Sequence, residues 1–139
     1  MPTDTTDPLR AALAQAIADK ATAESVLEQH RKAIARAAKL ALDAEARLAA
    51  ATAELEKAHG QRVHALAHAA AGGGATSKIP MREVRDAALD AQDETDAARG
   101  AVHVLQIELA GLEDAVREAG NRVVAARNAV IAPIAAARL

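Results

Sequence analysis

Apolar residues recur at alternating spacings of three and four along the second half of this chain. The series comprises Met81, Val84, Ala88, Ala91, Thr95, Ala98, Val102, Leu105, Leu109, Leu112, Val116, Ala119, Val123, Ala126 and Val130. Only Thr95 in this series is polar. A seven-residue repeat sustained over such a length is typical of a coiled-coil seam, in which one helical stripe packs against another helix. We therefore expect residues 81–132 to form one long helix.

The first half has its own period of seven, with two unequal columns. One column holds Leu13, Leu27, Ile34, Ala41, Leu48 and Leu55, interrupted by Lys20 and Arg62. The column three residues later holds Ala16, Ala23, His30, Ala37, Ala44, Ala51, Ala58 and Ala65. Small residues at one seam position let two helix axes approach more closely than the usual separation of about 8–10 Å. The pattern predicts a second long helix in a tight, antiparallel pair.

Composition supports this all-α interpretation. Alanine supplies 41 of the 139 residues, and the chain has no Phe, Trp, Tyr or Cys. The 30 larger aliphatic side chains cannot fill a compact α/β or all-β core at normal packing density. The absence of cysteine excludes a disulfide, a thiol nucleophile and a thiolate metal site.

One cluster of loop-forming residues, between Gly72 and Pro80, divides the chain. Asp7 and Pro8 suit the start of a helix, the triple glycine suits its end, and Thr76 or Ser77 could cap the next helix. We expect a single domain with a cap segment 1–7, a helix 8–71, a Gly-rich turn 72–80, a helix 81–132 and an apolar C-terminal tail 133–139.

Charge placement predicts that the two helices fold back on each other. If the turn centres near residue 76, residues equally far before and after it face each other. The basic stretch 31–39 then lies opposite the acidic stretch 113–118, and Glu54 and Glu56 lie near Arg99. Each exposed pair contributes only a few tenths of a kcal/mol, so the matching sets orientation and register more than stability. The expected fold is a long antiparallel two-helix coiled-coil hairpin.

Apolar residues outside the seam predict self-association. The first helix outruns the second by about a dozen residues, which leaves its start unpaired, and the second helix has apolar residues on a second face. The residues expected to contact another copy or another protein are Leu9, Leu13, Ile17, Leu89, Val104, Ile107, Val124, Ile131, Ile134 and Leu139. The tail either docks on a partner or folds over the unpaired start of the first helix. Because a two-helix hairpin cannot bury two faces, we expect a four-helix bundle or a larger oligomer.

Three histidines precede the turn, and His64 and His68 have the i, i+4 spacing of a helical metal pair. The zinc-protease pattern requires Glu directly after the first His, where this chain has Ala65. We interpret the histidines as a solvated helix end, with His64 and His68 as weak metal candidates, and expect no metal. No cofactor is expected either, because the Gly72–Lys78 stretch lacks the order and context of a phosphate loop.

The densest basic patch comprises Arg31, Lys32, Arg36 and Lys39. Without aromatic residues to stack bases, and with a net charge of −2, we interpret it as the partner of the acidic stretch across the hairpin and expect no nucleic acid. The two serines, Ser25 and Ser77, lie in no nucleophile motif, so we expect no enzymatic activity.

The expected function is that of a non-enzymatic structural or assembly protein. Its alanine and arginine usage suggests a GC-rich bacterial or phage genome, and hence a phage or prophage particle component (a virion protein). Two alternatives remain open: an amphipathic coat, similar in composition to the phasins that cover polyester granules, and a small adaptor, chaperone or inhibitor that binds a protein. No stretch approaches the roughly 18 apolar residues of a membrane span, and the start MPTDTTDPLR lacks a secretory pattern. We expect a cytoplasmic or particle-bound protein without transmembrane insertion.

Overall fold

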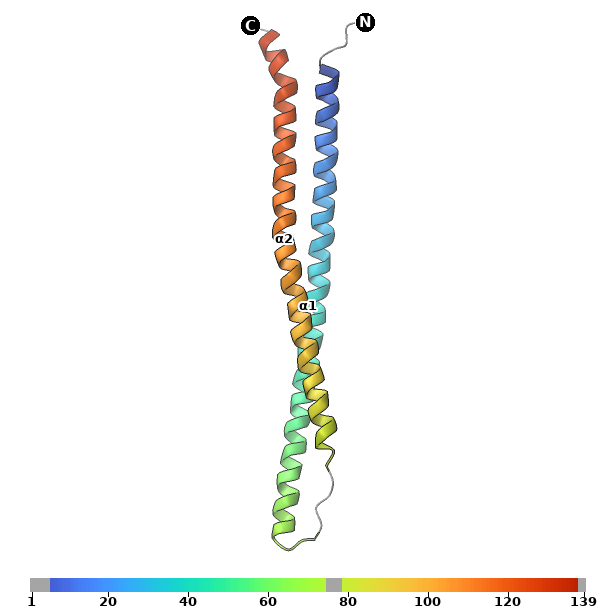
Figure 1. The fold of residues 1–139 in the computed structure, drawn as a ribbon, viewed down its shortest axis with the longest axis vertical. Helices are drawn as coiled ribbons and strands as arrows, with labels where there is room; N and C mark the ends of the chain where they lie inside the picture. The colour runs from blue at the N-terminus through green and yellow to red at the C-terminus, as the bar shows by residue number, and fades with distance from the viewer. Residues whose placement is uncertain (1–5, 75–78, 138–139) are drawn as a thin grey trace. The chain divides into compact units, whose positions relative to one another are not determined.

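The computed structural model describes residues 6–74 and 79–137, which form two long helices and no strand (Figure 1). Helix α1 spans Thr6–Ala70 and helix α2 spans Met81–Ala137. The prediction of an all-helical chain with two long helices packed against each other is confirmed. Within the described ranges, neither helix contains a segment long and apolar enough to cross a membrane.

The helix ends differ from the predicted ones mainly at Pro133. Helix α2 continues through Pro133 to Ala137, so the prediction that residues 133–139 form a separate tail is wrong for the described part. Proline removes one backbone hydrogen bond and crowds the preceding turn. Because only about one more helical turn follows, this cost is confined to the end of the helix. Ile134 accordingly lies on α2, whereas Leu139, Thr76 and Ser77 lie outside the described residues.

Two glycines end α1 as the sequence predicts. The Gly73 N–H donates to the His68 carbonyl at 3.0 Å, and the Gly72 N–H donates to the Ala69 carbonyl at 3.1 Å. Gly72 has a φ of 92°, in the left-handed region that side chains with a Cβ disfavour. This pair of hydrogen bonds around a left-handed residue is the Schellman motif, which satisfies the last carbonyls of a helix.

Substituting Gly72→Ala is expected to lower the free energy of unfolding by about 1 kcal/mol, because alanine must adopt the left-handed conformation. Gly72→Asn should cost less, since asparagine tolerates this region better. Urea denaturation followed by circular dichroism at one fixed protein concentration measures both. Equal stability of Gly72→Ala and the wild type would contradict the motif.

The chain divides into two compact units, and each contains part of both helices. The first unit pairs residues 1–34 with 104–139, so the start of α1 lies beside the end of α2 (Figure 1, blue and red). The second unit comprises residues 35–103 and contains the connection between the helices.

Burial follows the predicted seam in both units. Every position of the fifteen-residue series in α2 is buried or half-buried, and in the two columns of α1 only Arg62 is exposed. The buried apolar side chains are Ala16, Leu27, Ala41, Ala44, Ala58, Met81, Ala91 and Ala119. Thr95 is 0 % exposed, and its hydroxyl donates to the Ala91 carbonyl at 2.8 Å, which explains how a polar residue fits the seam. The core therefore consists mainly of alanine.

Within each unit, later residues of α1 contact earlier residues of α2. The predicted register between the two helices is wrong, however. In the second unit Arg99 Nε donates to Glu45 Oε1 at 3.0 Å, and Arg47 Nε lies 3.5 Å from Glu94 Oε2. The sequence register placed Arg99 about ten residues further along α1, beside Glu54 and Glu56. A seven-residue repeat stays aligned when one helix slides by whole heptads, and weak surface ion pairs do not select among the registers. The connection between the helices is about ten residues long and can span roughly 33 Å, which permits the slide.

In the first unit a histidine links the two helices. His30 occupies the alanine column, and its Nε2 lies 2.7 Å from the Leu105 carbonyl and 3.8 Å from Glu108 Oε2. Further along, Lys20 Cε lies 4.0 Å from where a Cβ on Gly120 would lie. Among the described residues, no ion pair between the helices involves the basic patch at residues 31–39, contrary to the predicted pairing across the hairpin.

The unpaired end of α1 lies at the connection rather than at the start. Leu9 and Leu13 are half-buried, and the start of α1 belongs to the same compact unit as the last part of α2, which continues to Ala137. The prediction that they project past their partner is therefore wrong, although Ile17 is 53 % exposed. At the other end Val63 and Leu66 are about half exposed, since α2 begins beside earlier residues of α1.

Candidate functional site

The predicted metal candidates do not form a cluster. His64 and His68 are exposed, and the His68 ring lies against Gly73. The third histidine, His59, lines a hollow beside Met81. In the part of the chain that the structure describes, no group of three His, Cys, Asp or Glu side chains could hold a metal ion.

Most of the predicted partner-binding residues are exposed. Those with large exposed fractions are Ile17, Leu89, Val104, Ile107, Val124, Ile131 and Ile134. Five exposed aliphatic residues were missed, and all lie on α1: Val26, Leu40, Leu42, Val63 and Leu66. In the second helix, partner-binding residues were predicted as apolar residues outside the seam. The same criterion identifies these five residues, because each lies outside the two seam columns of the first helix.

Three adjoining hollows form a groove along one side of the second unit. Their volumes are about 280, 450 and 330 Å³. The first two share Leu55 and Arg85, and the third continues the series one turn beyond Leu48. We call this surface the e-side groove because it follows heptad position e, the position directly after each second-column residue of α1, with Glu45 and Thr52 on α1 and the equivalent Arg85 on α2. Both walls therefore come from the described part of residues 35–103.

The groove has an apolar floor and exposed apolar rims. Leu48 and Leu55 of α1 are half-buried on the floor. On the rims Leu42 is 65 % exposed and Leu89 is 63 % exposed, and each lines one of the hollows. An exposed apolar patch with this concave setting is typical of a protein-binding surface.

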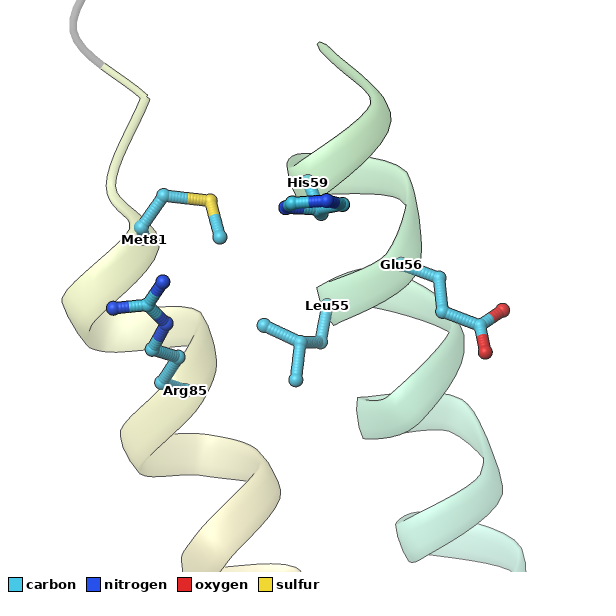
Figure 2. Close-up of a pocket in the computed structure, with 5 residues that line it drawn as sticks. All are labelled: Leu55, Glu56, His59, Met81 and Arg85. Carbon is cyan, nitrogen blue, oxygen red and sulfur yellow. The ribbon is translucent and has the colours of Figure 1, made fainter. Parts of the chain in front are cut away.

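A buried methionine lines the end of the groove near the connection. Figure 2 shows Met81 directed from α2 toward the His59 ring on α1, with Leu55 below it and the Arg85 side chain beside the gap. Glu56 points away from α2 at the outer edge of the same hollow. Met81 is buried, so the hollow has an apolar wall on α2, with Glu56 at its outer edge.

The two walls of the groove differ in charge. The α1 wall carries the carboxylates of Glu45 and Glu56, whereas the α2 wall carries the guanidinium groups of Arg85 and Arg99. Glu45 and Arg99 already form a hydrogen-bonded ion pair at 3.0 Å across the third hollow. A ligand of the groove would therefore meet an apolar centre between one acidic and one basic edge.

Comparison with known protein families, curated proteins and solved structures finds no match for this chain.

Proposed function

We propose that this chain is a non-enzymatic assembly module that acts through helix–helix packing and self-associates, with two hairpins forming a four-helix bundle or a larger particle. The supporting observation is the area left exposed. The chain exposes 9938 Å². A compact monomer of this size exposes about 6,800 Å². The excess is larger than the roughly 800 Å² that each partner contributes to a stable interface.

The composition of the exposed area supports the same proposal. Among the described residues, twelve large aliphatic side chains are exposed, whereas alanine dominates the buried set. Burying one Leu, Ile or Val side chain contributes about 1.5–3 kcal/mol. Packing against a second copy would therefore stabilise each hairpin substantially. In this proposal the helices pair as an antiparallel coiled coil whose alanine column allows close contact.

Size-exclusion chromatography with light scattering tests the proposal on the full-length chain. At about 50 µM we expect a mass of at least twice that of one chain, since an interface of standard size commonly gives a micromolar or tighter affinity. The apparent stability should also rise with protein concentration, because dimerisation stabilises the folded state. A helical monomer at this concentration would contradict the proposal and favour an adaptor that depends on a different protein.

A further inference from the structure

We propose that a second copy of this chain occupies the e-side groove, groove against groove, around a two-fold axis parallel to the helices. Helix α1 of each copy then covers helix α2 of the other within the second unit. This inference rests on the proposed self-association and specifies the surface and the orientation through which it occurs.

The charged walls favour a second copy as the occupant. A two-fold axis parallel to the helices keeps each residue at its level and exchanges the two sides of the groove. Glu56 and Arg85 line the same hollow and therefore lie at one level. In the dimer each Glu56 thus faces the partner's Arg85, and this contact occurs twice. Complementary charges of this kind select partner and orientation.

The third hollow extends the same complementarity. Glu45 and Arg99 already pair at 3.0 Å within one chain and lie at one level of the groove. The two-fold axis places this pair against its own copy in the opposite order, which makes an alternating group of two carboxylates and two guanidinium groups. Networks of several charges with bidentate arginine contribute more than isolated surface pairs.

The perpendicular two-fold axis is disfavoured by the same residues. It would place α1 on α1 and α2 on α2 in reversed direction, so the wall with Glu45 and Glu56 would meet the same acidic wall of the other copy, and Arg85 would lie toward the partner's Arg99. Like charges across an interface are repulsive. The distribution of charge therefore selects one of the two symmetric arrangements.

The apolar residues of the groove provide the attraction. Dimerisation would cover the rim residues Leu42 and Leu89, both more than 60 % exposed, and the floor residues Leu48 and Leu55. An apolar centre with charged edges is the usual anatomy of a protein–protein interface. An isologous contact also buries these leucines on both copies at once and leaves no copy of the groove open.

A charge exchange in the full-length chain tests the proposal. Glu56→Arg and Arg85→Glu should each weaken dimerisation about tenfold, since each change replaces two attractive contacts with two repulsive ones. The double variant Glu56→Arg/Arg85→Glu should restore the dissociation constant to within about threefold of the wild type. Glu54→Arg makes the same change outside the groove and should leave the constant unchanged. Sedimentation equilibrium measures the constants, and circular dichroism verifies that helicity is retained.

A cross-linking experiment tests the orientation independently, using the absence of native cysteine. Thr52 and Gln92 line the middle hollow from opposite helices. A mixture of Thr52→Cys chains and Gln92→Cys chains should oxidise mainly to the mixed disulfide dimer. Predominant Thr52→Cys homodimers would overturn the parallel axis.

The outcomes separate this inference from the proposed function. A wild-type dimer whose affinity is insensitive to both single substitutions, or is not rescued by the double variant, overturns the groove as the interface but leaves self-association standing. A monomeric wild type overturns the proposed function and this inference together. Binding of the groove to a helix of a different protein, with the chain itself monomeric, belongs to that second outcome.

Discussion

Replacing Ala44 with leucine is expected to lower the free energy of unfolding by about 2–3 kcal/mol. Ala44 is 1 % exposed and lies in the alanine column of α1, in the same unit as the fully buried Thr95 of α2. The three extra carbons have no space unless the helices move apart, and such movement would also loosen the neighbouring alanine contacts. Urea denaturation at a fixed protein concentration measures the change.

Ala46 provides the matched control, because it is exposed on the same turn of the same helix. Ala46→Leu should change the free energy of unfolding by no more than about 0.5 kcal/mol, as surface substitutions usually do. If Ala44→Leu were tolerated as well as Ala46→Leu, the two helix axes could not be as close together as direct alanine contacts require. The alanine core described above would then be incorrect.

The triple substitution Gly60→Ala, Gly100→Ala and Gly111→Ala is expected to raise the free energy of unfolding by about 2 kcal/mol. All three glycines lie inside helices, and a Cβ at each would meet no atom within 4 Å. Alanine restricts the unfolded chain and favours the helix by about 0.5–1 kcal/mol at each such position. Thermal melting and urea denaturation should both show the increase.

The single variants show whether each glycine faces solvent in the assembled protein. Gly111 lies on the outer face of α2 near Val104 and Ile107, both strongly exposed. If Gly111→Ala alone lowered stability or weakened the oligomer, another helix would have to pack closely on this glycine. Gly60→Ala serves as the reference, since it lies outside that apolar surface.

The elements and their buried faces could be predicted because they depend on periodicity alone. Val102 and Val116 are half-buried for the same reason that Thr95 is buried, namely their place in a seven-residue repeat. Register could not be predicted in this way. The repeat is unchanged by a slide of one heptad, and the Glu45–Arg99 pair is only one of several charge pairings that slides of this kind produce.

The candidate groove was only half visible in the sequence. Leu89 was predicted to contact a partner because it is an apolar residue outside the seam of the second helix. Its counterpart Leu42 was not, although it lies outside both columns of the first helix. The groove depends on which part of α1 lies beside Leu89. Since the register determines that pairing, a wrong register would hide the groove even with both leucines identified.

The alanine core has a calorimetric consequence. The heat-capacity change of unfolding grows with the apolar surface that becomes hydrated. Among the buried apolar residues of the described ranges, only Leu27 and Met81 are larger than alanine. A single hairpin therefore has a smaller heat-capacity change per residue than a globular domain with a core of branched and aromatic side chains. Its stability curve is correspondingly broad and flat, so the free energy of unfolding changes little between cold and moderate temperatures.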